Sequence, residues 1–272
     1  MRVIAVLATY NEELFIAGCL EHLFRQGVDV YLIDNCSTDR TVSIAERYLR
    51  KGLIDIETYP RHDAYSWRPL LERKEQLAAN LDADWLMHVD ADEIHLPPRT
   101  DRTLAQAFAE AEKRGYNAVN FLEFTFVPTR DAPDHEHAGF QETMRFYYPF
   151  APSFPHLVRA WRRQVEPPEL SWSGGHHVRF PGLRLSPVPF RMRHYLFLSV
   201  PHAIRKYVNK RYDPTELEAG WHGWRARLQE DVIRLPSSAE LRPYRGDDKL
   251  DPSEPRSRHY LDELLAGDRQ AD

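Results

Sequence analysis

Cysteine is scarce in this chain, and long hydrophobic runs are missing. Only two cysteines, Cys19 and Cys36, occur among 272 residues, which is too few for a disulfide framework and gives no metal-ligand spacing. No apolar run approaches the roughly 20 residues that span a bilayer. The short apolar run in MRVIAVLATYNEE is followed at once by acidic residues, which predicts a first β-strand rather than a secretory signal. We therefore expect a cytoplasmic protein.

An excess of positive charge is also missing. The formal net charge is −5, which gives no reason to expect nucleic-acid binding. One basic stretch, residues 191–211, departs from this balance and contains Arg191, Arg193, Arg205, Lys206, Lys210 and Arg211. Such a stretch suits peripheral contact with anionic lipid at the inner face of a membrane, or with a phosphorylated acceptor. The simpler interpretation, which we favour, is an ordinary solvated helix face.

Hydrophobic periodicity alternates between strand-like and helix-like along residues 1–126. The predicted strands are 2–8, 29–33, 53–59, 85–89 and 116–126, and the predicted helices are 12–26, 41–50, 68–81 and one that is capped by Thr100 or Asp101 and ends at Lys113. Strands that alternate with helices of this length predict an α/β fold, with a mostly parallel sheet covered by helices on both faces.

The rest of the chain is predicted to form two further regions. Residues 127–200 are rich in proline, histidine and aromatic residues, which favours short strands and long loops in a smaller mixed region. Residues 201–272 are predicted to form a helical extension, with helices at 202–211 and 217–233 and a weakly ordered tail around 246–258. The predicted division is therefore 1–126, 127–200 and 201–272.

Polar side chains follow three of the predicted parallel strands. Thr9, Tyr10, Asn11 and Glu12 follow the first strand, Asp34 and Asn35 the second, and Asp90, Ala91, Asp92 and Glu93 the fourth. In such sheets ligands bind outside the carboxyl ends of the strands. The sequence therefore predicts a ligand site at this edge, in which Asp90 and Asp92 would suit a hard cation such as Mg²⁺ or Mn²⁺.

Three of these segments carry a resemblance to a known family. VLATYNEE, IDNCSTDRT and DADWLMHVDADEI match, in order and spacing, the inverting family 2 glycosyltransferases, which have the GT-A fold. The resemblance covers roughly the first 95 residues. It implies a metal-dependent transferase that moves a sugar from a UDP-, GDP- or dTDP-sugar to a hydroxyl of a glycan, glycolipid or other acceptor, with residues 127–200 forming the acceptor side.

The resemblance also implies roles for individual residues. Thr9, Tyr10, Asn11 and Glu12 fall on the loop against the base and ribose, Asp34 on the position that binds the base, and Lys74 on a basic position near the base or diphosphate. Asp90 and Asp92 match the D-x-D motif, with Asp92 as the direct metal ligand and Asp90 and Ala91 nearer the donor. His194, which ends a later strand-like run, is our first choice for a third metal ligand.

The second half departs from the commoner family pattern. Many relatives carry an acidic pair about a hundred residues after D-x-D, and nothing near residue 190 matches it. An inverting transfer still needs a group that accepts the acceptor's proton. The candidates are Glu123, Glu142, Glu166, Glu169, Asp134 and His176, and among them we favour Glu142 or His176. The glycines of SWSGGHHVRF also let the backbone approach a ligand closely, which would bring His176 or His177 near a phosphate or a metal.

The sequence leaves two other functions open. A nucleotidyltransferase that makes a nucleotide sugar has a similar α/β domain, but such enzymes open with a glycine-rich loop that YNEE lacks. A non-catalytic carbohydrate-binding relative would keep the fold, but it would not need D-x-D and Asp34. The stretch DAPDHEH has metal-like composition without a ligand spacing, so we interpret it as a solvated loop or an acceptor-side lid.

Overall fold

Hydrophobic side chains fill both faces of the strands nearest the N-terminus. In β1 (Val3–Thr9) every residue but Ala8 is buried, and all of β4 (Trp85–Val89) is buried. Strands with this pattern belong in the middle of a sheet that is covered on both sides. The structure is a computed structural model, and it describes residues 1–61, 64–208 and 210–268.

The chain divides into two units that are discontinuous in sequence. The first unit contains Met1–Arg61, Trp67–Leu122 and Pro155–Arg193, and the second contains residues 64–66, Glu123–Phe154 and the described residues from His194 to Asp268. The predicted division at residues 126 and 200 stays a prediction, and the last four positions of its third region lie outside the described residues.

The first unit holds the parallel sheet. Its strand order is β6-β8-β4-β1-β2-β3, and β5 pairs with β9. Strands β4, β1, β2 and β3 run parallel to one another, whereas β8 is antiparallel to β4 and β6. The remaining strands are β2 (Val28–Asp34), β3 (Leu53–Thr58), β5 (Glu93–Leu96), β6 (Ala118–Phe126), β8 (Leu157–Arg162) and β9 (Phe190–Tyr195). The chain passes into the second unit within β6 and within β9.

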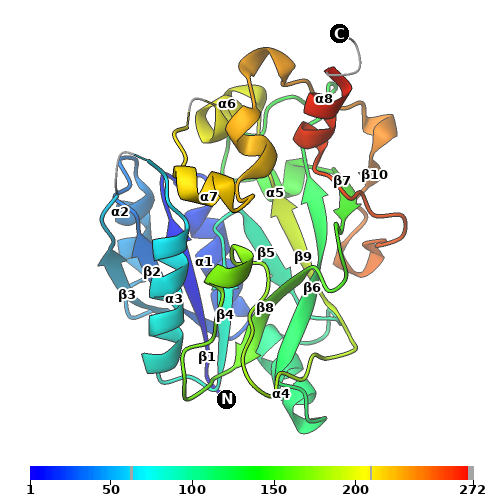
Figure 1. Cartoon of the computed structure of the whole chain (residues 1–272). Coiled ribbons are helices and arrows are strands. Elements are labelled where there is room, and N and C mark those ends of the chain that lie inside the picture. Colours follow the sequence, from blue (N-terminus) through cyan, green and yellow to red (C-terminus); the bar gives the residue numbers. More distant parts are fainter. Residues whose placement is uncertain (62–63, 209, 269–272) are drawn as a thin grey trace. The chain divides into compact units, whose positions relative to one another are not determined.

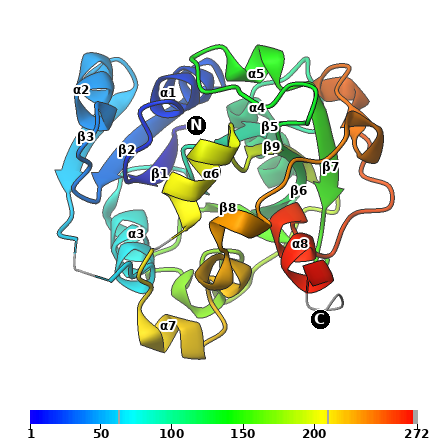
Figure 2. The same cartoon turned by 90° about the horizontal axis from the view of Figure 1, so that it is seen from above.

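Helices cover both faces of these strands. The α-helices of the first unit are α1 (Ile16–Arg25), α2 (Thr41–Ala45), α3 (Arg68–Asn80) and α4 (Leu104–Lys113), and its 3₁₀ turns are Glu46–Tyr48 and Ser171–Ser173. Figure 2 shows α1 and α2 on one face of β1, β2 and β3, and α3 on the other. Leu70 and Leu77 of α3 pack on Val6 and Ile33 of the strands. The predicted α/β architecture with a mostly parallel sheet is confirmed.

The second unit has an antiparallel ribbon and its own core. Strand β7 (Phe146–Phe150) pairs with the end of β6 and with β10 (Arg242–Pro243). Its helices are α5 (Phe140–Thr143), α6 (Val200–Tyr207), α7 (Pro214–Glu218) and α8 (Tyr260–Asp268), which Figure 1 labels, and its 3₁₀ turns are Gly223–Arg227, Glu230–Val232, Ser238–Glu240 and Asp247–Lys249. Tyr148, Phe197, Trp224 and Leu261 belong to its core.

Two expectations about the helical extension differ from the structure. The helix predicted at 217–233 is wrong, because α7 ends at Glu218 and short 3₁₀ turns follow. Gly220 and His222 have φ values of 78° and 61°, and left-handed residues interrupt an α-helix. The tail around 246–258 was expected to be weakly ordered. In the structure it has defined backbone partners, since Arg256 exchanges backbone hydrogen bonds with Pro149 and Ala151.

Candidate functional site

The carboxyl ends of β1, β2 and β4 lie at one edge of the parallel sheet. Thr9 is the register partner of Asp34, and Leu7 is the register partner of Val89, which directly precedes Asp90. The structure therefore brings together the three polar segments that the sequence places after these strands. Within the first unit, this is the edge at which parallel α/β sheets bind ligands.

Hydrogen bonds tie the loop after β1 to the loop after β2. The Asn11 side-chain oxygen accepts from the Thr38 backbone N–H at 2.7 Å, and the Asn11 N–H donates to Ser37 Oγ at 3.0 Å. The Glu12 N–H donates to Thr41 Oγ1 at 2.8 Å. Asn11 has a φ of 56°, a conformation that asparagine tolerates better than most residues. Asn11 and Glu12 thus fix the shape of this edge.

Asp34 is buried at the end of β2, and the residues next to it make contacts of their own. Asp34 is 3% exposed, and its carboxylate accepts from the Ser37 N–H at 3.0 Å. Arg61 donates to Asn35 Oδ1 at 2.9 Å and lies over the Tyr10 ring, with its guanidinium carbon 3.6 Å from the ring centroid. Arg61 therefore links Tyr10 to Asn35, the residue that follows the buried Asp34.

Asp90 lies between two cationic side chains. Its Oδ2 accepts from Arg159 Nη1 at 3.2 Å, and its Oδ1 lies 3.9 Å from Lys74 Nζ. Arg159 also donates from Nη1 to Glu93 Oε1 at 2.5 Å. The Asp90 side chain keeps 28% of its surface exposed, whereas Lys74 and Arg159 keep 1% and 8%. Two nearly buried cations therefore hold one carboxylate that solvent can still reach.

Lys74 is not an exposed helix residue. Its ammonium lies 2.8 Å from His88 Nδ1 and donates to the Val89 carbonyl at 3.2 Å. Burial lowers the pKa of Lys74 to about 8, while Asp90 opposes that shift and Arg159 adds to it. Burial, with Lys74 and Arg159 nearby, holds the pKa of His88 well below its usual value. At neutral pH the pair is therefore a charged lysine that donates to a neutral imidazole.

Three members of this cluster were not predicted as site residues. Glu93 is in the VDADE segment, but nothing in the sequence distinguishes it from a turn residue. His88 is in an apolar strand, where its position indicates only burial. Arg159 is on β8, about seventy residues after Asp90, so only the antiparallel pairing of β8 with β4 brings it there. No local sequence signal identifies Arg159.

The turn after Asp90 holds the remaining D-x-D residues. The Glu93 N–H donates to the Asp90 carbonyl at 3.2 Å, which closes the turn. Asp92 is 9% exposed and Ala91 5% exposed. Asp90 and Asp92 thus supply carboxylate oxygens from one turn, and these are the atoms that Mg²⁺ and Mn²⁺ prefer. The residues present fit such an ion.

The glycines of SWSGGHHVRF do allow a close backbone approach. Gly175 has a φ of +86°, and a Cβ there would lie 3.0 Å from both His88 Nε2 and Leu71 Cδ2. Its carbonyl accepts from Arg159 Nε at 3.1 Å. The approach is therefore to the cluster around Asp90. His176, the next residue, is exposed in this unit.

Two other predicted residues belong to the second unit. Glu142 is exposed on α5. His194 is at the end of β9, and its Nδ1 lies 2.7 Å from Glu123 Oε1. Their predicted roles, Glu142 as the base that takes the acceptor's proton and His194 as a metal ligand, stay predictions.

A comparison with protein families supplies the identity that the geometry suggests. The profile described as Glycosyl transferase family 2 matches residues 4–165. The chain belongs to this family. The match covers β1, Asp34, the D-x-D turn and Arg159, which is the part of the chain that builds the polar edge. It confirms the resemblance, and with the parallel sheet it confirms a GT-A type fold.

Solved structures of glycosyltransferases are also similar to the chain. S. aureus TarS (residues 1–349), in complex with UDP-GlcNAc, is 16% identical over 72% of this chain and 58% of that one, with a TM-score of 0.43. Glucosyl-3-phosphoglycerate synthase from Mycobacterium tuberculosis, in complex with Mn²⁺, UDP and phosphoglyceric acid, is 18% identical over 46% and 43%, with a TM-score of 0.32. The chain spans 38% of TarS 1–349 in its UDP complex. No curated protein sequence matches it.

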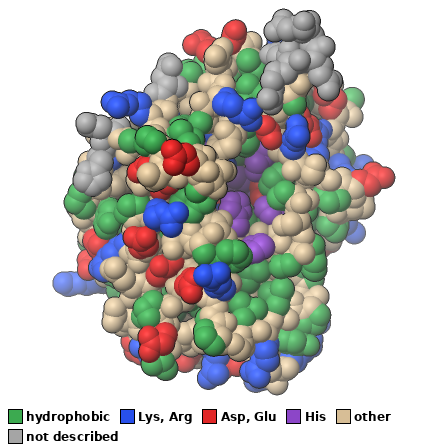
Figure 3. All heavy atoms as spheres, viewed as in Figure 1, with side chains coloured by type: hydrophobic (Ala, Val, Ile, Leu, Met, Phe, Trp, Pro, Cys, Tyr) green, Lys and Arg blue, Asp and Glu red, His purple; other side chains and the backbone are tan. Residues whose placement is uncertain are grey.

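The surface of the protein carries charges of both signs (Figure 3). Acidic and basic side chains are interspersed over the face drawn in Figure 3. In the basic stretch, Arg191 donates to the carbonyls of Pro97 and Pro98, and Arg205 pairs with Glu136. Among the described residues, no helix has the length and hydropathy needed to cross a membrane.

Proposed function

We propose that the chain transfers a sugar from a nucleoside-diphosphate sugar to an acceptor hydroxyl, with inversion and with the help of Mn²⁺ or Mg²⁺. UDP-, GDP- and dTDP-sugars are the candidate donors, and a glycan or glycolipid is the candidate acceptor. Membership of family 2 supports glycosyl transfer. The main observation in favour of a donor-binding site is the position of the Asp90 carboxylate. It is held between Lys74 and Arg159, at the sheet edge where Asp34 also lies.

The base and ribose would bind where the first two loops meet. The Ser37 N–H uses only part of the accepting capacity of the Asp34 carboxylate, so a base N–H can add a second hydrogen bond there. Tyr10, with Arg61 over one face, offers a flat surface beside it. Thr9, Asn11 and Glu12 hold the loop in shape, as their backbone bonds to the second loop show.

The diphosphate would lie near the D-x-D turn. Asp92 and Asp90 would hold the Mn²⁺ or Mg²⁺, which would offset the charge that develops on the departing nucleoside diphosphate. Lys74 and Arg159 hold the Asp90 carboxylate from the buried side. Because both are nearly buried, they position that carboxylate without competing for the phosphate in solvent.

Inversion requires in-line attack by the acceptor. The acceptor oxygen forms a bond to the anomeric carbon while the bond from that carbon to the diphosphate oxygen breaks, and the diphosphate leaves with the electron pair. A base takes the hydroxyl proton. His176 and Glu142 remain the proposed bases. His176 is better supported, because it follows Gly175, whose carbonyl Arg159 holds.

Release of nucleoside diphosphate from a panel of nucleotide sugars, with and without Mn²⁺, tests this proposal. The Asp92→Asn variant should lose metal-stimulated turnover by about 100-fold or more, since the carboxylate that holds the ion is gone. The matched control is Asp101→Asn, because Asp101 is an exposed acid paired with Arg99. It should keep wild-type turnover.

The alternatives predict different outcomes of the same assay. A nucleotidyltransferase would release pyrophosphate from a nucleoside triphosphate and a sugar 1-phosphate, and would release no nucleoside diphosphate. A non-catalytic relative would release neither product. Unchanged, Mn²⁺-dependent turnover in Asp92→Asn would exclude the proposed metal role.

A further inference from the structure

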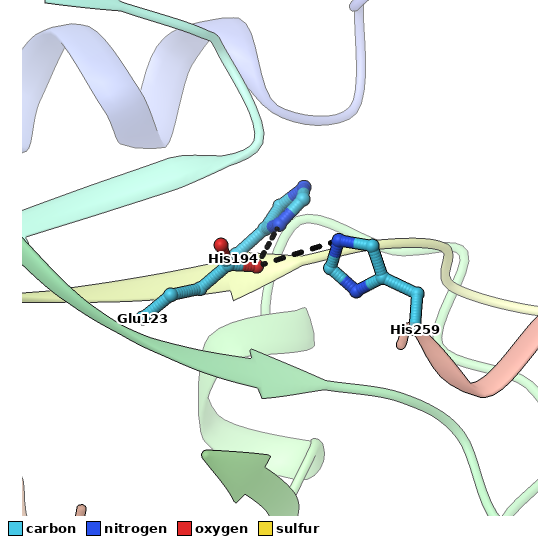
Figure 4. A group of neighbouring side chains, drawn as sticks. All are labelled: Glu123, His194 and His259. Atoms are coloured by element: carbon cyan, nitrogen blue, oxygen red, sulfur yellow. Dashed lines mark hydrogen bonds and ion pairs between the residues drawn. The ribbon is translucent and has the colours of Figure 1, made fainter. Parts of the chain in front are cut away.

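Two histidine side chains of the second unit converge on one carboxylate oxygen of Glu123. Figure 4 shows His194 and His259 both directed at Glu123. His194 Nδ1 lies 2.7 Å and His259 Nε2 4.0 Å from Glu123 Oε1. One ligand atom from each residue lies within 4.8 Å of the other two. Their side chains are 4%, 12% and 10% exposed for Glu123, His194 and His259, so the group is nearly enclosed.

Backbone pairing within the unit explains how residues so far apart in sequence meet. Glu123 of β6 is the register partner of Phe150 in β7. Phe150 forms a bridge with Arg256, three residues before His259. His194 comes from β9, which also pairs with β6. Each of the three therefore stands on a backbone segment that is held in place.

Further contacts orient the possible ligands. The His259 ring stacks on Phe150, with centroids 3.7 Å apart and planes 19° apart, and its Nδ1 lies 3.2 Å from the Tyr148 hydroxyl. That hydroxyl also accepts from the Tyr260 N–H at 3.1 Å. Thr125 donates to Glu123 Oε1 at 2.9 Å. Partners of this kind fix the ring orientation and the tautomer of metal-binding histidines.

We propose that Glu123, His194 and His259 bind a divalent transition-metal ion, for which Zn²⁺ is the best match. Two imidazoles and one carboxylate suit Zn²⁺ and its neighbours in the first row better than Mg²⁺ or Ca²⁺. Zinc bonds of about 2.1 Å place tetrahedral ligand atoms about 3.4 Å apart. The two distances to Glu123 Oε1 lie on either side of that value. Small side-chain shifts therefore make room for an ion, which replaces the proton shared by His194 and Glu123.

This ion differs from the one proposed at the D-x-D turn. Asp90 and Asp92 offer only oxygen ligands, whereas the group around Glu123 offers two nitrogens and one oxygen. His194 was predicted as a metal ligand, and the proposal keeps that role but gives it Glu123 and His259 as partners. The ion would join β6, β9 and the segment before α8, and three protein ligands would leave a fourth position for water.

Metal titration of the whole 272-residue chain tests the proposal. The metal-free protein titrated with Co²⁺, a coloured substitute for Zn²⁺, should develop the visible absorption of a low-coordinate nitrogen-ligated ion. Equilibrium dialysis should give one tightly bound Zn²⁺. The variants Glu123→Gln, His194→Gln and His259→Gln should each lose the Co²⁺ band and bind Zn²⁺ at least 100-fold more weakly.

Two controls separate loss of a ligand from loss of folding. Tyr148→Phe removes only the hydroxyl that faces His259, and it should weaken Zn²⁺ binding by about 10- to 100-fold while the far-ultraviolet circular dichroism is unchanged. His222→Gln alters another histidine–glutamate pair of the same unit, His222 with Glu216, and should leave metal binding unchanged.

Two results would overturn the proposal. One is a wild-type protein that gives no Co²⁺ band and retains no Zn²⁺ in dialysis. The other is a band that Asp92→Asn abolishes and Glu123→Gln and His259→Gln retain, which would place the ion at the D-x-D turn. Because the measurement needs no donor or acceptor, its result is independent of the transferase activity.

Discussion

His88 links the buried polar cluster of the first unit to the stability of the fold. Its side chain is fully buried, its Nδ1 lies 2.8 Å from Lys74 Nζ, and its Nε2 has no hydrogen-bond partner among the described residues. A third positive charge beside Lys74 and Arg159 would be unfavourable, because both burial and these two cations oppose it. The imidazole must therefore stay neutral in the folded chain, and this explains the direction in which its pKa is shifted.

Acid should consequently destabilise the protein through His88. The pKa of His88 lies well below 6.5 in the folded state and near 6.5 in the unfolded state. The stability that its neutral form contributes is therefore present above pH 6.5 and is lost as the pH falls below that value. Urea unfolding of metal-free protein between pH 5 and 8 should show this slope. His88→Gln should reduce the slope, and the exposed variant His137→Gln should keep it.

The two loops that follow β1 and β2 act as one element. Asn11 supplies both a side-chain acceptor and a left-handed backbone, and Thr41 Oγ1 accepts from Glu12. Thr41 is itself held by Asp39, which accepts from its N–H at 2.9 Å. The proposed base and ribose site is therefore bounded by two hydrogen-bonded loops that follow the ends of β1 and β2.

Asn11 variants separate the contribution of the amide from that of the backbone. Asn11→Gly keeps the positive φ without strain and should lose only the amide bonds, about 1 kcal/mol. Asn11→Ala should cost about 1 kcal/mol more, because alanine is strained in the left-handed region. The free energy of unfolding in urea measures the difference. Equal values for the two variants would show that the backbone conformation of Asn11 contributes nothing.

At the scale of the whole molecule, each unit has a core of its own. In the first unit the core lies between the parallel sheet and its helices, and in the second the C-terminal helix completes it. Leu261 of α8 is fully buried in a cluster with Tyr148, Phe197 and Trp224. Helix α8 is therefore an integral part of the second unit, and it follows directly on the proposed metal ligand His259.

Truncating Leu261 should accordingly destabilise the second unit. Leu261→Ala should lower the free energy of unfolding by about 3 kcal/mol, since it leaves a cavity in a packed core. Leu217→Ala is the matched control, because Leu217 in α7 of the same unit is 41% exposed, and it should change stability by less than about 0.5 kcal/mol. Thermal or urea unfolding measures both. A loss below 1 kcal/mol for Leu261→Ala would mean that α8 is not needed for this core.

The amino-acid sequence by itself determined the parallel part of the sheet in the first unit and the helices that alternate with its strands. Alternating apolar strands and amphipathic helices predict the parallel sheet, because each periodicity reflects which faces must be buried. The segments after β1, β2 and β4 could be placed at one edge, since parallel strands end on the same side. The family resemblance was also visible in the sequence, because it rests on the short segments that follow these three strands.

Only the tertiary structure decided which partners surround these residues. Arg159 reaches Asp90 through antiparallel pairing of β8 with β4, and His259 reaches Glu123 through the pairing of β7 with the segment at Arg256. Such pairings join positions 69 and 136 residues apart, whereas sequence patterns report burial over a few residues. For the same reason the sequence suggested His194 as a metal ligand but could not supply Glu123 and His259 as the side chains beside it.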